Sequence, residues 1–121
     1  MTRKILIVDD DRDFVSSLQY RLETRGYEVE TCAHGGEAHD KIVESDFGLV
    51  LLDYFLPGVK GDEICESLRQ DANRKHIPII IITGFSDYKE SFFKDKGATD
   101  VLYKPFEMDE LFERIERYMP Q

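Results

Sequence analysis

Short apolar runs alternate with longer amphipathic segments along this chain. Five runs are rich in Ile, Leu and Val or alternate apolar with polar residues, and this pattern predicts β-strands. The predicted strands cover residues 4–8, 27–32, 48–52, 77–82 and 100–103. Between and after them, apolar residues recur three or four positions apart, which predicts helices with one buried face. The predicted helices cover residues 12–25, 36–45, 61–71, 86–97 and 107–118.

Local signals indicate where several of these helices begin and end. Asp11 follows the first strand and is expected to cap the first helix, and Ser86 is expected to cap the fourth. Gly97 is expected to end the fourth helix, because glycine readily adopts the left-handed conformation that follows a helix. The fourth helix is expected to carry three aromatic residues: Tyr88, Phe92 and Phe93.

Five strands that alternate with five helices predict βαβ units and an α/β fold with a parallel, doubly wound sheet. The nearly continuous apolar strands fit a sheet that is covered on both faces. Right-handed crossovers leave few possible arrangements of the strands. In such sheets, ligands bind beyond the carboxyl ends of the strands, so functional residues are expected at that edge.

Composition narrows the class of protein. The length of 121 residues predicts one domain, residues 1–121, with charged residues at 34% and hydrophobic residues at 41%. No apolar run approaches the ~20 residues that cross a bilayer, and residues 1–4 lead into a strand without a signal-peptide pattern. We therefore expect a cytoplasmic protein without a membrane partner. Whether it stands alone or is part of a longer protein stays open.

Charge and cysteine content exclude two further classes. The formal net charge is −9, which argues against direct binding of nucleic acid, because phosphate backbones attract basic surfaces. Cys32 and Cys65 are expected to be free thiols in a reducing cytosol. Neither cysteine has a second ligand at the spacing of a zinc site.

Polar residues with a shared chemistry stand at the predicted carboxyl ends of four strands. They are Asp9 and Asp10 after the first strand, Asp53 after the third, Thr83 after the fourth and Lys104 after the fifth. Crowded carboxylates favour a hard cation such as Mg²⁺, and an aspartate can act as a nucleophile that forms an acyl phosphate. Each residue alone has a plain structural explanation as a turn, strand end or surface residue. Their convergence at one edge favours a magnesium and phosphoryl site.

Motifs along the whole chain resemble the receiver domains of two-component response regulators. The motifs lie at residues 5–10, 51–53, 56–58 with Gly61, 81–84, 97–98 and 104–106. The resemblance implies a flavodoxin-like fold with strand order 2-1-3-4-5. It also implies a phosphorylation-dependent switch that catalyses only its own phosphorylation and hydrolysis, rather than an enzyme acting on a separate metabolite.

The resemblance assigns a role to each candidate residue. Asp53 accepts a phosphoryl group from a histidine kinase or a histidine phosphotransfer protein. Mg²⁺ is bound by Asp53, by Asp10 directly, by Asp9 through water and by the backbone carbonyl of Phe55.

The resemblance also assigns the groups around the phosphoryl group and the output surface. Thr83 and Lys104 contact the phosphoryl group, Gly84 leaves room for it, and the Lys104–Pro105 peptide is cis. Output, through a homodimer or an output domain, uses the fourth helix, the fifth strand and the fifth helix.

Two residues depart from the family pattern. Val101 stands three positions before Lys104, where an aromatic residue is usual, and Lys60 stands before Gly61, where a small or acidic residue is usual. Lys60 is expected to alter the electrostatics of its loop. Tyr103 projects to the same side of its strand as Val101. Tyr103 either repacks on activation in place of the missing aromatic or is only a partner contact, and both alternatives stay open.

Three other classes of protein fit part of the pattern. An aspartyl phosphatase of the haloacid-dehalogenase group usually has a second aspartate where this chain has Phe55. A flavin-dependent electron carrier of the same fold needs a Ser/Thr-rich phosphate loop after the first strand, which is absent. An interaction domain that is never phosphorylated needs no acidic pocket.

Overall fold

Five strands alternate with five helices in the computed structural model, which describes residues 3–71, 76–85 and 87–119. The strands are β1 (Lys4–Val8), β2 (Glu28–Cys32), β3 (Leu49–Asp53), β4 (Ile79–Thr83) and β5 (Asp100–Tyr103). The helices are α1 (Arg12–Thr24), α2 (Gly35–Glu44), α3 (Gly61–Gln70), α4 (Glu90–Asp95) and α5 (Met108–Tyr118).

All five strands are parallel and form one sheet in the order β2-β1-β3-β4-β5, as predicted. The strand order reverses between β1 and β3, which leaves a crevice at the carboxyl ends of these two strands. Val8 pairs with Leu52 at that end, so the residues that follow them are brought together. Thr83 pairs with Tyr103 at the same edge.

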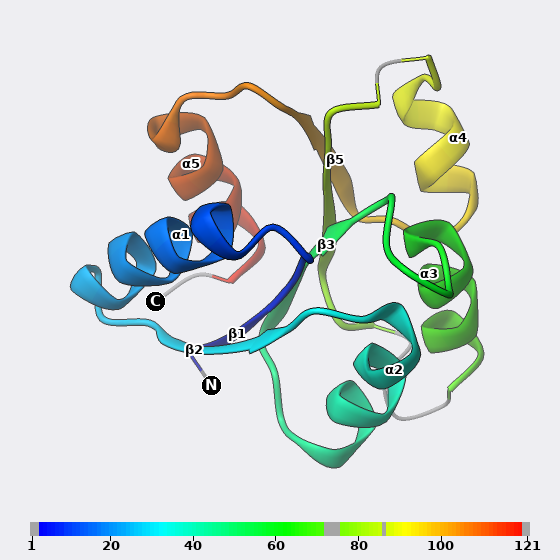
Figure 1. The fold of residues 1–121 in the computed structure, drawn as a ribbon, viewed down its shortest axis with the longest axis horizontal. Helices are drawn as coiled ribbons and strands as arrows, with labels where there is room; N and C mark the ends of the chain where they lie inside the picture. The colour runs from blue at the N-terminus through cyan, green and yellow to red at the C-terminus, as the bar shows by residue number, and fades with distance from the viewer. Residues whose placement is uncertain (1–2, 72–75, 86, 120–121) are drawn as a thin grey trace.

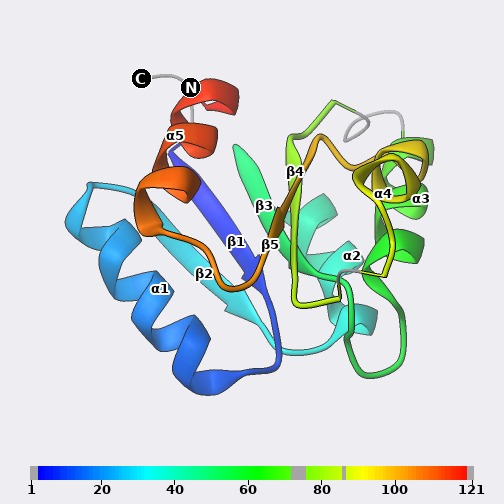
Figure 2. The same cartoon turned by 90° about the horizontal axis from the view of Figure 1, so that it is seen from above.

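The helices cover both faces of the sheet. Helices α1 and α5 lie on one face, and α2, α3 and α4 lie on the other (Figures 1 and 2). None of the helices within the described ranges is long and apolar enough to span a bilayer.

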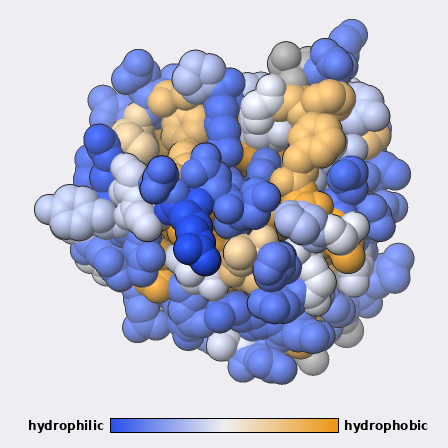
Figure 3. All heavy atoms as spheres, viewed as in Figure 1, coloured by the Kyte–Doolittle hydropathy of each residue, from blue (hydrophilic) through white to orange (hydrophobic). Residues whose placement is uncertain are grey.

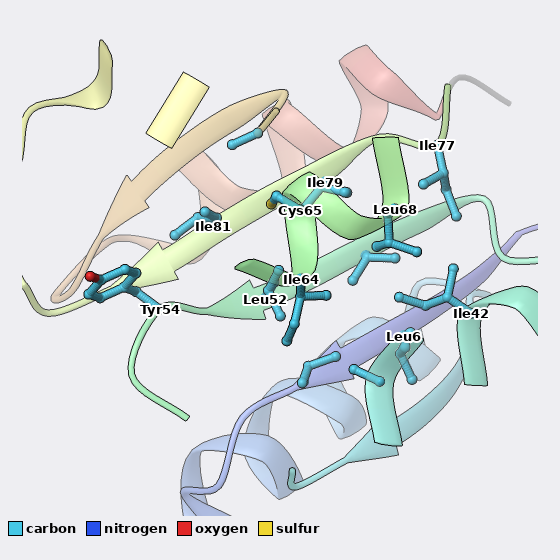
Figure 4. Packing of buried hydrophobic residues seen from close by; sticks show 14 of the residues in the cluster. Leu6, Ile42, Leu52, Tyr54, Ile64, Cys65, Leu68, Ile77, Ile79 and Ile81 are labelled. Carbon is cyan, nitrogen blue, oxygen red and sulfur yellow. The ribbon is translucent and has the colours of Figure 1, made fainter. Parts of the chain in front are cut away.

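Alternate residues of each strand feed two separate hydrophobic cores, because side chains point to opposite faces of a strand. Leu6, Leu52 and Ile81 pack toward α2, α3 and α4 (Figure 4). Ile5 and Leu51 pack on the other face, with α1 and α5. Strands buried on both faces explain the nearly continuous apolar runs in the sequence.

The ends of the helices follow the sequence in part. Asp11 caps α1 as predicted, and its side chain accepts a hydrogen bond of 3.2 Å from the Phe14 N–H. Glu107 caps α5 in a reciprocal arrangement with Glu110.

The predicted start of α4 is wrong. The helix begins at Glu90 after a cap at Lys89, so Tyr88 lies outside it, while Ser86 lies outside the described residues. The physical reason is that the Tyr88 carbonyl accepts a hydrogen bond of 2.8 Å from the Tyr103 hydroxyl, and the Phe92 N–H donates to Lys89 instead. A residue 15 positions away thus replaces a helical partner.

Gly61, the first residue of α3, packs closely against the end of β3. A Cβ atom at this position would lie 2.5 Å from the Asp53 carbonyl oxygen and 3.0 Å from the Tyr54 Cα. The Gly61 N–H also donates a hydrogen bond of 2.9 Å to the Tyr54 carbonyl. The absence of a side chain therefore lets α3 approach the backbone that carries Asp53.

We predict that Gly61→Ala destabilises the protein by about 1–3 kcal/mol, because backbone atoms rather than a flexible side chain must move. Gly36→Ala is the matched control, since a Cβ at this helical glycine meets nothing within 4 Å. The control is expected to be neutral or to stabilise the protein by up to about 1 kcal/mol. Urea denaturation of both variants measures the difference, and equal stabilities would contradict the proposed close contact.

Candidate functional site

Three carboxylates meet at the carboxyl ends of β1 and β3. Asp9 and Asp53 are buried, with 5% and 9% of their surface exposed, and Asp10 is exposed. One oxygen from each of the three carboxylates lies within 4.8 Å of the other two. The sequence-based prediction that these acids gather at one edge is confirmed. The pairing of two adjacent parallel strands explains it, because Asp53 ends β3 and Asp9 follows the end of β1.

Crowding and burial change the acidity of Asp53. Burial, which is the largest cause, and the neighbouring charges of Asp9 and Asp10 together raise the pKa of the Asp53 carboxyl to about 6. The Lys104 amine and a hydrogen bond from the Tyr54 N–H act in the opposite direction on this pKa. At neutral pH the Asp53 carboxylate is therefore ionised in an environment that favours its neutral form. Such a group gains from any cation that joins the cluster.

Lys104 is the basic residue of the site, and it lies closest to Asp9. Its Nζ atom lies 3.1 Å from Asp9 Oδ2 and 4.2 Å from the centre of the Phe14 ring. The Lys104–Pro105 peptide is cis, as predicted. The sequence indicated neither the pairing with Asp9 nor the ring beneath the amine.

Both carboxylate oxygens of Asp9 have a hydrogen-bond donor. The Asp11 N–H donates to Oδ1 at 2.9 Å, and Lys104 donates to Oδ2 at 3.1 Å. These bonds fix the orientation of the buried Asp9 side chain. Asp9 therefore has less capacity than Asp10 or Asp53 to bind a cation directly.

Thr83 ends β4 and is fully buried, with 0% of its surface exposed. Its Oγ1 atom accepts a hydrogen bond of 3.0 Å from the Phe85 N–H. Because this bond uses only an acceptor lone pair, the hydroxyl hydrogen can still be donated. A Cβ added at Gly84 would meet nothing within 4 Å, so the backbone beside Thr83 is open, as predicted.

Six aromatic residues near the site were not predicted to act together, and we call them the aromatic cluster: Tyr54, Phe55, Phe85, Tyr88, Phe92 and Phe93. The Phe55 and Phe85 ring centres lie 4.9 Å apart, edge to face. Figure 3 shows apolar side chains gathered on the face in view, on the side where Figure 1 places α4. The cluster joins Tyr54 and Phe55 to four aromatic residues that are distant from them in sequence, so no local pattern could reveal the whole cluster.

Tyr54 lies at the end of the core that is nearest the carboxyl ends of the strands (Figure 4). Its ring stacks on Phe85 at 5.8 Å and contacts Phe93 edge to face at 5.4 Å. Phe55, the next residue, is 46% exposed, and the Lys60 Nζ lies 5.0 Å from the centre of its ring. Lys60 therefore lies beside Phe55 in the loop that follows Asp53. Its effect on the electrostatics of that loop stays a prediction.

Comparison with known proteins shows which family this chain resembles. Residues 5–116 match the response regulator receiver domain. The phosphate regulon transcriptional regulatory protein PhoB of Rhizobium meliloti is 38% identical over 116 residues, which cover 95% of this chain and 51% of that protein. The chain spans about half the length of the curated relatives that it matches.

Solved structures agree with the sequence comparison. A CheY-like response regulator receiver domain protein from Methanospirillum hungatei is 35% identical, with a TM-score of 0.90 over 98% of this chain and 94% of that one. The response regulator TrrA from Thermotoga maritima, solved in complex with Mg²⁺ and beryllofluoride, is 32% identical. Its TM-score is 0.86, over 98% of this chain and 99% of that one.

These matches leave no ground for assigning the chain to the haloacid-dehalogenase phosphatases or to the flavin-dependent electron carriers. The fold, the three gathered acids and the match over residues 5–116 all agree. The chain belongs to the response regulator receiver domain family of two-component signalling.

Proposed function

We propose that Asp53 accepts a phosphoryl group from a histidine kinase or a histidine phosphotransfer protein, in a reaction that needs Mg²⁺. The observation that carries this proposal is the cluster of Asp9, Asp10 and Asp53, whose carboxylate oxygens lie within 4.8 Å of one another. A buried carboxylate with a raised pKa beside two further acids fits a hard divalent cation.

The donor set favours particular roles around the cation. Asp10 and Asp53 are the direct carboxylate ligands, and the backbone carbonyl of Phe55 is a third protein ligand. Asp9 acts through water, because each of its oxygens already accepts a hydrogen bond. The TrrA structure with Mg²⁺ and beryllofluoride supports a metal of this kind in a similar chain.

The transfer itself is a displacement at phosphorus. An oxygen of the Asp53 carboxylate forms a bond to the phosphorus atom, the bond from phosphorus to the donor's histidine nitrogen breaks, and that nitrogen keeps the electron pair. A bound Mg²⁺ neutralises charge on the phosphoryl oxygens during this displacement. The Lys104 amine and the Thr83 hydroxyl hold the other phosphoryl oxygens. Attack of water on the same phosphorus atom returns Asp53 to the free carboxylate.

The output of this switch is proposed to leave through α4, β5 and α5. Phe92 and Tyr103 are partly exposed aromatic residues of this part of the molecule, and Tyr103 pairs with Thr83 across β4 and β5. A second copy of the chain or an output domain is the expected partner there. A rearrangement of α4 that follows phosphorylation of Asp53 would change what this surface can bind.

Incubation with acetyl phosphate and Mg²⁺ is expected to add the mass of one phosphoryl group to the protein. Asp53→Asn removes the nucleophile and should abolish the added mass, which intact mass spectrometry detects directly. Asp46→Asn, which changes an exposed acid before β3, is the matched control and should be modified like the wild type. A phosphoryl group retained in Asp53→Asn would overturn the assignment, and an unmodified wild type would favour an interaction domain that is never phosphorylated.

Removal of the metal is expected to stop the reaction. An excess of chelator should reduce the labelling of the wild type by at least 100-fold, and restored Mg²⁺ should recover it, since the carboxylates need a cation to approach a phosphoryl donor. Asp10→Ala should have a similar effect, whereas Asp13→Ala, at an exposed position in α1, should not. Labelling at the full rate in chelator would exclude a metal-dependent mechanism.

The raised pKa of Asp53 predicts how stability depends on pH without metal. The folded pKa of about 6 exceeds the ordinary value of 3.8, so the folded state holds this proton more tightly. The stability that the protonated Asp53 carboxyl contributes to the folded state is fully present below pH 3.8 and is lost as the pH rises toward 6.

Asp53→Asn should therefore stabilise the protein at pH 7.5 in chelator, by roughly 1–3 kcal/mol. The gain should shrink as the pH falls from 6 toward 4, and excess Mg²⁺ should remove it by stabilising only the wild type. Urea denaturation at several pH values measures these differences, with Asp46→Asn as the control. A gain in stability that is independent of both pH and Mg²⁺ would show that the burial and crowding of the Asp53 carboxylate do not cause the gain.

A further inference from the structure

Two hydrogen bonds hold Phe85 and Tyr88, which lie between β4 and α4. The Phe85 N–H donates to Thr83 Oγ1 at 3.0 Å. The Tyr103 hydroxyl donates to the Tyr88 carbonyl at 2.8 Å. Each bond has one partner in the sheet, Thr83 or Tyr103, and these two residues are neighbours across β4 and β5. The Lys104 N–H reinforces this pair by donating to the Thr83 carbonyl at 2.8 Å.

Tyr88 connects its carbonyl to α4 through its own ring. The ring stacks on Phe92 at 4.2 Å and meets Phe85 edge to face at 4.8 Å. It also lies 6.2 Å from Phe93, whose side chain is the fully buried anchor of α4. A shift of the Tyr88 backbone is therefore transmitted to α4 through ring contacts that resist compression.

Tyr103 reaches the start of α4 from the neighbouring strand. Its side chain packs against the core that contains Val101, so the two residues project to the same side of β5, as predicted. Burial and the charge of Glu90, the first residue of α4, raise the pKa of the Tyr103 hydroxyl. Val101 itself is 1% exposed and β-branched, so it has neither the length nor the freedom to bridge to Tyr88.

We propose that Tyr103 is a positioning residue that couples Thr83 to α4 through the carbonyl of Tyr88. The coupling rests on the proposed phosphorylation of Asp53, which draws the Thr83 hydroxyl toward a phosphoryl oxygen. Rotation of Thr83 breaks its bond to the Phe85 N–H and frees Phe85 to move. Because the Tyr103 hydroxyl keeps the Tyr88 carbonyl tied to β5, Phe85 passes this movement to α4 through the Tyr88 ring, which it meets edge to face at 4.8 Å.

The bond from Tyr103 to Tyr88 lies at the surface, where water competes for both groups. Its loss should therefore change coupling more than overall stability. This difference separates a positioning role from a merely structural one. Tyr103→Phe removes only the hydroxyl and keeps the ring in its place against the core.

The test compares amide NMR shifts before and after addition of beryllofluoride and Mg²⁺, which mimic the acyl phosphate. In the wild type we expect responses both beside Asp53 and in α4, residues 90–95. In Tyr103→Phe the response beside Asp53 should be kept, and the response in α4 should fall by at least half. Tyr118→Phe is the matched control. It removes a hydroxyl on α5 that donates a hydrogen bond of 2.8 Å to Asp100, the first residue of β5. The control should retain the α4 response.

A full α4 response in Tyr103→Phe would overturn the coupling while leaving the proposed function intact. A wild type without any response beside Asp53 would instead overturn the proposed function, and the coupling with it. A second measurement needs no variant: the ring signals of Tyr103 in the wild type must shift when the Asp53 region responds. Unchanged ring signals would show that Tyr103 does not take part.

Discussion

The burial of the Asp53 carboxylate beside two further acids is the constraint on which the rest of the structure depends. Asp9 and Asp53 are held in buried positions because β1 and β3 are neighbours in a fully covered parallel sheet. Asp53 is the last residue of β3 and Asp9 directly follows β1, so the pairing of these two strands holds both acids at one edge. The cost appears as the raised pKa of Asp53, and Lys104 offsets it only in part. A site of this kind responds strongly to any charge that enters it, which is what a chemical switch requires.

The rest of the fold supplies the rigidity that keeps the acids together. An apolar core packs against each face of the sheet. Gly61 allows α3 to pack directly on the backbone of Asp53 and Tyr54. The Lys104 amine is placed between Asp9 and the Phe14 ring, so the basic group is also fixed. Rigid placement matters because electrostatic stabilisation of a transferring phosphoryl group needs groups that are already in position.

Sequence patterns predicted the features that follow from periodicity and strand order. Asp9, Asp53 and Thr83 could be placed at one edge because parallel strands share the direction of their carboxyl ends. The start of α4 could not be predicted, because the Tyr88 carbonyl is bound by a hydroxyl from another strand. Lys104 was placed at the site, but its pairing with Asp9 depends on side-chain positions that no spacing rule fixes. Tertiary contacts between distant residues account for both differences.

The usual aromatic residue is absent at Val101, and the proposed coupling gives its role to Tyr103 through contacts of this kind. Val101 is 1% exposed, and its short side chain lies within the core on the α4 side of the sheet. Tyr103 lies two residues after Val101 on the same side of the strand, nearer its carboxyl end. Its side chain is long enough for the hydroxyl to reach the carbonyl of Tyr88. The aromatic cluster then lies between this bond and α4, in contact with the loop that follows Asp53. In the proposed coupling, a signal that begins at Asp53 reaches α4 through packed rings and one hydrogen bond, and Tyr103→Phe tests the bond while keeping the ring.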